Sequence, residues 1–315
     1  MPTVRLAPGV ALVAVPGGGL AVRTPDGEFL RVDTGGVSEE ALLARLSGTT
    51  GAAPTPDPGP ELARLTAAFA AAGYLTCTDA DADADVRTGA DRGADHGTGT
   101  GAGSLAGRRV LLIGDPVLTE PLARCARDGG ARVRAVSPEH LTALTGDGPP
   151  TAAVWCLDSP VPPGLWDAAD RLPERGVAWL RCHREGAQTW LEPLAAEPGD
   201  VTSADVRLRR LAATPAYREL AAYWAGSPTP DTGPGHSAAS AALTVGLLMR
   251  ELVAWAGGAR RRRLLGRIDL RDLTVTTHPV LPVPTVAPHP AGPYGLAPES
   301  RRDRTATGGT VDARG

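Results

Sequence analysis

A stretch with almost no large apolar side chain, residues 77–104, divides the chain of 315 residues into two parts. Such a stretch cannot bury enough apolar surface to offset the entropy lost on ordering, so we expect a flexible linker. Each flanking part must then supply its own hydrophobic core. The expected boundaries are an N-terminal module at 1–78, a linker at 79–105, a larger domain at 106–297 and a disordered polar tail at 298–315.

The aspartates of this stretch allow a second interpretation. Between Asp79 and Asp85 they alternate with other residues, as the oxygen ligands of a calcium loop do. Such a loop also needs glycine at its sixth position and glutamate at its twelfth, where this chain has Ala84 and Ala90. We therefore favour a solvated linker over a calcium site.

The N-terminal part predicts a small antiparallel sheet and two helices. Three short apolar runs are separated by Gly-rich and Pro-Asp-Gly turns, which is typical of a three-stranded meander. Ser38 can cap the first helix, and Gly73 ends the second. The expected strands are 10–15, 20–23 and 29–32, and the expected helices are 39–46 and 61–72.

The larger part predicts a doubly wound α/β sheet. It opens with the buried strand Arg109–Gly114, a helix and a second strand, which together make a βαβ unit. The further expected strands are 152–157, 177–182 and 267–276, and the expected helices are 119–128, 165–172, 214–224 and 237–255.

The first strand-to-helix turn of this sheet lacks the features of a phosphate site. Such a turn needs several glycines whose amide groups approach the phosphates, but only Gly114 is present, and Pro116 removes a donor. Asp115 and Glu120 would repel phosphate, and Ser137 stands where a ribose-binding carboxylate is expected. The sequence favours an inherited scaffold over a working nucleotide site.

Other residues with reactive side chains give weak signals. Cys182 and His183 are adjacent where a predicted strand passes into a turn, so their side chains should point to opposite faces, and we interpret them as a buried thiol and a surface imidazole rather than a nucleophile pair. The cysteines form no CxxC and the histidines have no metal-binding spacing. The run Arg260–Arg263 is interpreted as a solvated structural run, with an acidic partner surface and nucleic acid as alternatives.

Charge and hydropathy limit the partners. A formal net charge of -3 gives no general attraction to nucleic acid or to an acidic membrane. The longest apolar run, Ala238–Met249, is shorter than the ~20 residues that cross a bilayer. We expect a cytoplasmic protein with neither a membrane partner nor a nucleic-acid partner.

Several segments together resemble the ThiF-like partner proteins of azoline-forming cyclodehydratases, which act in ribosomal peptide natural-product biosynthesis, including that of thiopeptides. Segments 41–51 (ALLARLSGTTG) and 62–75 (LARLTAAFAAAGYL) are similar to helices of the small winged-helix module called a RiPP recognition element. A Pro-rich loop at 52–60 replaces that module's middle helix. Segment 192–212, the helix at 238–255 and the segment 281–289 (LPVPTVAPH) are similar to the family's larger domain.

The resemblance implies a fold and a division of labour. The fold is an α/β architecture, with a winged-helix module followed by a Rossmann-like, ThiF or ubiquitin-activating-like domain. In such systems a YcaO-family cyclodehydratase binds ATP, and the partner captures the leader of the precursor peptide. The chain is then a non-enzymatic binding subunit without a cofactor, and a homodimer is left open.

The resemblance also implies a peptide-binding site, in which an extended leader adds a strand to the edge strand 29–33 and packs against the helix 61–72. The apolar candidates can serve either the site or the module's core, and the two arginines are candidates for contacts with acidic leader residues. The candidate residues are Phe29, Leu30, Arg31, Val32, Asp33, Leu62, Arg64, Leu65, Ala68 and Phe69.

The family's four zinc-binding cysteines are absent. Ser203, Val206, Val286 and His289 stand at those positions, and one histidine with a serine cannot replace four thiolates, so no zinc is expected. Two other function classes stay open. One is an active ThiF-type adenylating enzyme, and the other is a Rossmann-type oxidoreductase with an unrelated N-terminal module.

Overall fold

The computed structural model describes residues 3–17, 19–46, 59–78, 103–226, 229, 233–259 and 262–284. The predicted calcium alternative at 79–85, the tail at 298–315, Val286 and His289 lie outside these residues. So do Arg260 and Arg261 of the arginine run.

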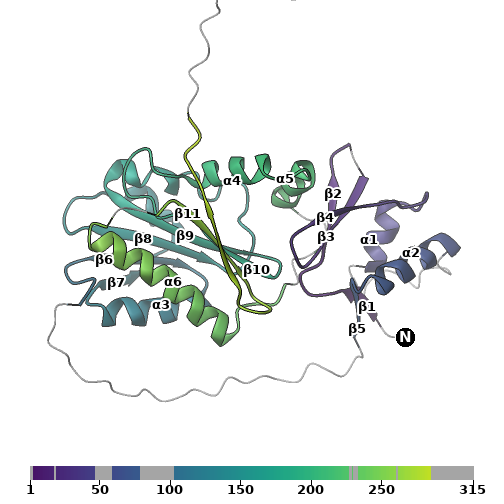
Figure 1. Cartoon of the computed structure of the whole chain (residues 1–315), viewed down its shortest axis with the longest axis horizontal. Coiled ribbons are helices and arrows are strands. Elements are labelled where there is room, and N and C mark those ends of the chain that lie inside the picture. The colour runs from purple at the N-terminus through teal and green to yellow at the C-terminus, as the bar shows by residue number, and fades with distance from the viewer. Residues whose placement is uncertain are drawn as a thin grey trace, which may run out of the picture. The chain divides into compact units, whose positions relative to one another are not determined.

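The N-terminal segment forms the predicted meander (Figure 1). Strands β2 (Ala11–Val15), β3 (Gly19–Arg23) and β4 (Phe29–Val32) pair antiparallel in the order β2-β3-β4. Helices α1 (Glu39–Leu46) and α2 (Pro60–Ala71) cover one face, where Leu42, Leu46, Leu65 and Phe69 complete a core with Leu12, Leu20 and Val22.

A further strand pair joins the two ends of this segment. Strand β1 (Thr3–Leu6) pairs antiparallel with β5 (Leu75–Thr78), with Leu6 opposite Leu75. The sequence showed only a short apolar Tyr74-Leu75 at this point, because a two-stranded pairing between distant segments leaves no local turn signal.

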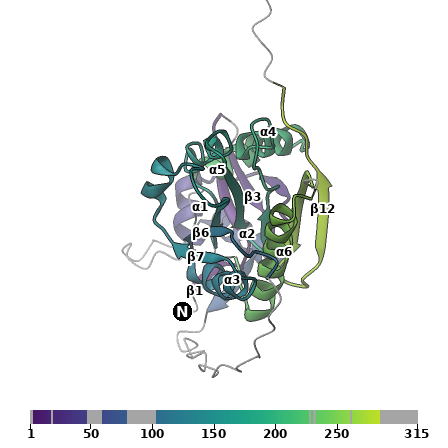
Figure 2. The same ribbon diagram turned by 90° about the vertical axis from the view of Figure 1, so that its left-hand side faces the viewer.

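The larger sheet has seven strands in the order β12-β11-β10-β9-β8-β6-β7 (Figures 1 and 2). Strands β6 to β9 pair parallel, and β9 to β12 pair antiparallel, so the sheet is mixed. The strands are β6 (Arg109–Gly114), β7 (Arg132–Ala135), β8 (Thr151–Leu157), β9 (Val177–Glu185), β10 (Gln188–Leu191), β11 (Leu264–Asp269) and β12 (Val275–Pro279).

The two faces of this sheet bury different side chains. On one face, α3 (Pro116–Asp128) and α6 (Ala238–Ala256) pack against each other and bury leucines and valines against β6, β8 and β9. On the other face, the rings of Trp155, Trp166 and Trp179 meet in one tilted and two T-shaped pairs, with ring centres 6.0 to 6.4 Å apart.

Two expectations about single elements were wrong. Residues 165–172 form turns and the 3-10 helix η2 (Ala169–Arg171), followed by η3 (Pro173–Arg175), instead of an α-helix. Pro162, Pro163 and Pro173 bracket the segment and interrupt helical hydrogen bonding. The expected strand 267–276 is a hairpin of β11 and β12, and Leu273, with a φ of 63°, lies in its turn.

Other elements in the larger domain, strand β10 among them, went unpredicted or were shifted. A 3-10 helix, η1 (Pro138–Ala143), follows β7. Helix α4 (Ser203–Ala212), which carries one aspartate and three arginines among its ten residues, was not predicted, and α5 (Tyr217–Ala225) begins after the expected start at 214.

Helix α5 also packs against the meander. Leu220, Ala222, Tyr223 and Trp224 share a buried cluster with Ala11 and Val13 of β2. The meander is therefore covered on one face by α1 and α2 and on the other by α5.

Helix α6 is long and apolar enough to cross a membrane by length and composition alone. A core helix of a soluble protein passes the same test. Here Ala241, Val245, Leu248 and Leu252 contribute to the buried cluster under the large sheet.

Candidate functional site

Strand β4 lies at one edge of the meander. It pairs with β3 on one side, and none of the described residues forms a strand against its other side. Helix α2 lies close to the end of this strand, since a Cβ atom added to Gly35 would come 3.2 Å from Arg64 Nη2 and 3.5 Å from Glu61 Oε2. The loop that follows β4 and the side chains at the start of α2 are therefore neighbours.

The candidate peptide-binding residues divide between core and surface. Leu65 and Phe69 are buried in the module core, and Leu62 and Val32 pack against it half-buried. Leu30 projects on the same side as Val22, its partner in β3, yet 46% of it is exposed. Leu30 is thus an apolar side chain that the core does not use, at the free edge of the sheet.

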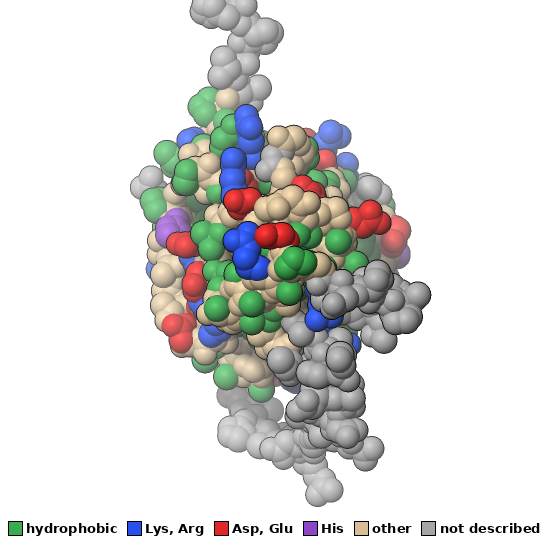
Figure 3. Space-filling model, turned by 90° about the vertical axis from the view of Figure 1, so that its right-hand side faces the viewer, with side chains coloured by type: hydrophobic (Ala, Val, Ile, Leu, Met, Phe, Trp, Pro, Cys, Tyr) green, Lys and Arg blue, Asp and Glu red, His purple; other side chains and the backbone are tan. Residues whose placement is uncertain are grey.

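The remaining candidates lie in three places. Ala68 and Asp33 are exposed, and Asp33 Oδ1 accepts a hydrogen bond from the Gly35 amide. Phe29 faces α5, where its ring meets that of Tyr223 edge to face. Figure 3, which views the side of the molecule nearest the N-terminal module in Figure 1, shows apolar, acidic and arginine side chains intermixed on that face.

Both candidate arginines have partners within the chain. Arg31 Nε donates to Glu219 Oε1 at 2.9 Å, and the Glu219 side chain is only 5% exposed. Burial alone would raise the pKa of Glu219, but hydrogen bonds from its own backbone amide and from Arg31 lower it. Arg64 pairs with Glu61 on the exposed face of α2, where water screens the pair and an acidic ligand can compete for it.

The turn after β6 is closed by a carboxylate. Asp115 Oδ2 accepts a hydrogen bond from the Asp158 amide at 2.6 Å, which ties the ends of β6 and β8 together. Asp158 in turn pairs with Arg184 at 2.7 Å. In an open α/β sheet a nucleotide binds at the point where the strand order reverses, and here that point lies between β6 and β8. Two carboxylates at this point oppose a phosphate.

Two of the positions at which the resemblance implies zinc ligands, Ser203 and Val206, lie among the described residues. Ser203 Oγ donates to Asp170 Oδ2 at 2.6 Å, and Val206 is buried with Val201, Leu265 and Val280. These positions thus carry a helix-start hydrogen bond and an apolar contact. Among the described residues, no group of three or more histidine, cysteine or acidic side chains could hold a metal ion.

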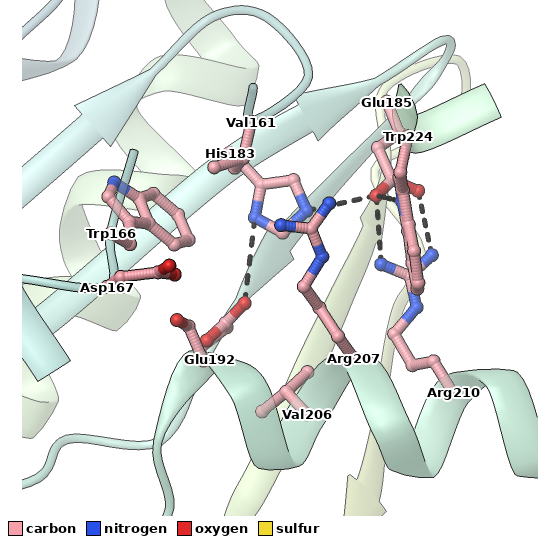
Figure 4. Close-up of a pocket in the computed structure, with 11 residues that line it drawn as sticks. Val161, Trp166, Asp167, His183, Glu185, Glu192, Val206, Arg207, Arg210 and Trp224 are labelled. Atoms are coloured by element: carbon pink, nitrogen blue, oxygen red, sulfur yellow. Dashed lines mark hydrogen bonds and ion pairs between the residues drawn. The ribbon is translucent and has the colours of Figure 1, made fainter. Parts of the chain in front are cut away.

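The interpretation of His183 as a surface imidazole was wrong. Strand β9 continues three residues past the predicted end, and all nine of its residues are buried. His183 Nε2 lies 3.1 Å from Glu185 Oε1, and Nδ1 lies 4.0 Å from Glu192 Oε1 (Figure 4). Cys182, by contrast, is buried as expected, and its hydrogen bond with Cys156, together with burial, raises the pKa of its thiol.

A network of buried charges surrounds this histidine. Glu185 accepts two hydrogen bonds from Arg210, at 2.9 and 2.7 Å, and one from Trp224 Nε1 at 2.8 Å. Burial would raise the pKa of Glu185, but Arg210 and His183 hold it well below its ordinary value. Burial prevails at Glu192, whose pKa is raised although Arg181 donates to it at 2.6 Å. Neighbouring carboxylates thus have opposite pKa shifts.

No protein-family model matches the sequence, and no curated protein matches it. Among solved structures, a chain of the E. coli microcin synthetase McbBCD complex is 12% identical, with 90% of this chain and 99% of that chain covered and a TM-score of 0.42. E. coli MccB is 8% identical, with 90% and 95% covered and a TM-score of 0.40. The heterocyclase TruD is 14% identical, with 89% and 41% covered and a TM-score of 0.30. With TM-scores below 0.5, these likenesses carry no functional conclusion.

Proposed function

We propose that this chain is a non-catalytic binding subunit that captures the leader of a ribosomal precursor peptide and presents its core to a YcaO-type cyclodehydratase. The observation that carries the proposal is the free edge of β4, with exposed Leu30 at that edge and α2 beside the loop that follows the strand. An extended leader would pair its backbone with β4 and place an apolar side chain on Leu30.

The proposal that the partner enzyme, and not this chain, binds ATP rests on the first strand-to-helix turn of the large sheet. Pro116, Asp115 and the link from Asp115 to the Asp158 amide leave little to hold a nucleotide there. We therefore assign ATP binding and amide activation to the partner enzyme. The proposal places the complex in the cytoplasm. The N-terminal segment would act as a winged-helix recognition module, with β1 and β5 tying its ends together.

Leader binding to the full-length protein tests the proposal. The probe is a fluorescently labelled leader encoded beside the gene, titrated against the wild type, Leu30→Asp and Val275→Asp. Val275 is the matched control, because it is also an exposed apolar residue, 39% accessible, on the edge strand β12. A buried charge at the contact should weaken binding by about tenfold, or about 1.4 kcal/mol, in Leu30→Asp alone.

Two outcomes contradict the proposal in different ways. If Leu30→Asp and the wild type bind the leader with equal affinity, the leader does not bind at the β4 edge. If the wild type does not bind the leader even with the YcaO-type partner present, the proposed role in leader capture is wrong. Saturable ATP binding by the isolated chain would then favour the adenylating enzyme.

A further inference from the structure

A cleft of about 400 Å³ lies between the meander and the large sheet, next to helices α4 and α5. Its walls come from the turn between β3 and β4, from β10, β11 and β12, and from helices α4 and α5. This volume falls in the range of small-ligand sites. Neither the nucleotide turn nor the β4 edge accounts for it.

Arginine dominates the charge of this cleft. Arg23, Arg209, Arg210 and Arg267 line it, against the carboxylates of Asp26 and Glu185. Glu185 is already bound by Arg210, as shown in Figure 4. Asp26 Oδ1 is bound by Arg271 at 2.6 Å. Both carboxylates are thus already paired, Glu185 with Arg210 and Asp26 with Arg271.

The other three arginines pair with no carboxylate among the described residues. Arg23 is 2% exposed, and its Nη2 donates to the Glu185 carbonyl, while its Nη1 has no hydrogen-bond partner in the described part of the chain. Arg267 donates to the Asp26 carbonyl, and Arg209 donates to the Leu281 and Pro282 carbonyls. Of the three, Arg23 is buried, Arg267 is half-buried and Arg209 is exposed. Burying the Arg23 cation without an anion is unfavourable, so an anionic ligand would be stabilised here.

Apolar surface lies between these charges. Trp190, Phe29, Leu220 and Val280 belong to the lining, and Arg210 stacks on Trp190 with its guanidinium carbon 3.8 Å from the ring centre. The three unpaired arginines come from β3, α4 and β11, so several separated anionic groups suit them better than one compact ion. Carboxylates spaced along a chain with apolar side chains have this chemistry.

We propose that this cleft binds an acidic, partly apolar peptide segment through Arg23, Arg209 and Arg267. The assignment to a peptide rests on the proposed function, because Phe29 both begins β4 and lines the cleft. A leader strand paired with β4 would pass the cleft as it leaves that end of the strand. The cleft thereby adds a preference for acidic residues to the backbone pairing at the edge.

The probe for this site is a fluorescein-labelled pentapeptide of alternating leucine and glutamate, with a twin in which glutamine replaces glutamate. Anisotropy titrations compare the wild type with Arg267→Gln, Arg209→Gln and Arg218→Gln. Arg218 is the matched control, because it is an exposed arginine of α5 outside the cleft and its loss changes the net charge equally. The first two variants should each lose about tenfold in affinity for the acidic peptide, and Arg218→Gln less than twofold.

The outcomes separate this proposal from leader capture. Acidic-peptide binding that Arg267→Gln weakens and Leu30→Asp does not would support the cleft even if the leader fails to bind. If the leader binds at β4 but the acidic peptide does not bind, the proposal for the cleft is wrong and the proposal for leader capture stands. Equal affinity for the glutamine twin would overturn the charge argument, and equal affinity for N-acetylglutamate would overturn the assignment to a peptide.

Discussion

Gly114 shows how one residue can fix the geometry at the end of a strand. Its φ is 105°, and an added Cβ would overlap the Cys156 carbonyl oxygen of the neighbouring strand β8. Gly114→Ala should therefore lower the free energy of unfolding by about 3 kcal/mol or more, through strain and displacement of β8. Urea denaturation followed by tryptophan fluorescence measures this change.

A second glycine separates the two causes of that loss. Gly199 also has a positive φ, 86°, but nothing lies within 4 Å of the position of an added Cβ. Gly199→Ala should lose only about 1–2 kcal/mol, from backbone strain. Equal losses in both variants would mean that the contact with Cys156 has no effect.

Glu185 and Glu192 should give the protein opposite pH responses. The pKa of Glu185 is lowered by Arg210 and His183 against the effect of burial, so its contribution to stability exists above its ordinary value of 4.5. That contribution is lost as the pH falls through the lower, folded-state pKa. Glu185→Gln should cost about 3–5 kcal/mol at pH 7, because Arg210 loses its partner, and less at pH 3.

Glu192 provides the comparison. Burial raises the pKa of Glu192, so its contribution is complete below 4.5 and is lost as the pH rises through the folded-state pKa. The destabilisation by Glu192→Gln should therefore shrink, rather than grow, from pH 3 to pH 7. Denaturant unfolding at both pH values measures the two slopes, and equal slopes would contradict the assigned shifts.

Among single residues, the network around His183 was not predicted from the sequence, for an identifiable reason. A strand was expected to end at Cys182, because His183, Arg184 and Glu185 are polar. In the structure, these polar side chains are buried because Asp158, Glu192 and Arg210 pair with them from distant segments. The high proportion of charged and titratable side chains along Arg181–Glu185 (Arg-Cys-His-Arg-Glu) was the available signal.

Elements with strong periodicity were predicted well, and elements that depend on distant partners were not. The meander, α2, β6, α3, β8 and α6 carry their own apolar pattern and turn residues. Strand β10, in contrast, has Gln188 and Thr189 buried against neighbouring strands, and its sequence alone has no strand periodicity. The free edge of β4 could be predicted from the sequence, but the cleft could not, since its arginines come from three distant segments.

Helix α4, which carries Arg209 and Arg210, depends on its first turn. Thr202 accepts a hydrogen bond from the Asp205 amide at 3.0 Å, and the Asp205 carboxylate accepts one from the Thr202 amide at 2.9 Å. Thr202→Ala should lower the free energy of unfolding by about 1 kcal/mol, whereas Thr202→Ser should retain nearly all of it. Thermal unfolding of both variants checks the expectation, and a loss in the serine variant as large as in alanine would contradict it.

For the molecule as a whole, contacts between the meander and α5 determine whether it unfolds in one step. The Leu12 amide donates to Thr229 Oγ1, Arg31 pairs with Glu219, and Phe29 meets Tyr223. All six tryptophans lie between Trp155 and Trp255, and five of them report on the larger domain, while Trp224 also packs against Ala11 and Val13 of the meander. Far-UV circular dichroism follows both parts. In the wild type the two signals should change together.

Tyr223→Ala should separate these transitions. Tyr223 is 3% exposed, and its ring contacts Phe29 and the Arg23 guanidinium, so truncation removes about 3 kcal/mol of packing from the contact with the meander. Tyr217→Ala, on the same helix but 50% exposed, should shift stability by less than about 0.5 kcal/mol and leave the signals coincident. Coincident transitions in Tyr223→Ala would mean that the meander and the large sheet are coupled by contacts other than those of α5. Separated transitions would show that α5 makes the β4 edge and the arginine cleft parts of one cooperative unit, as a peptide that contacts both requires.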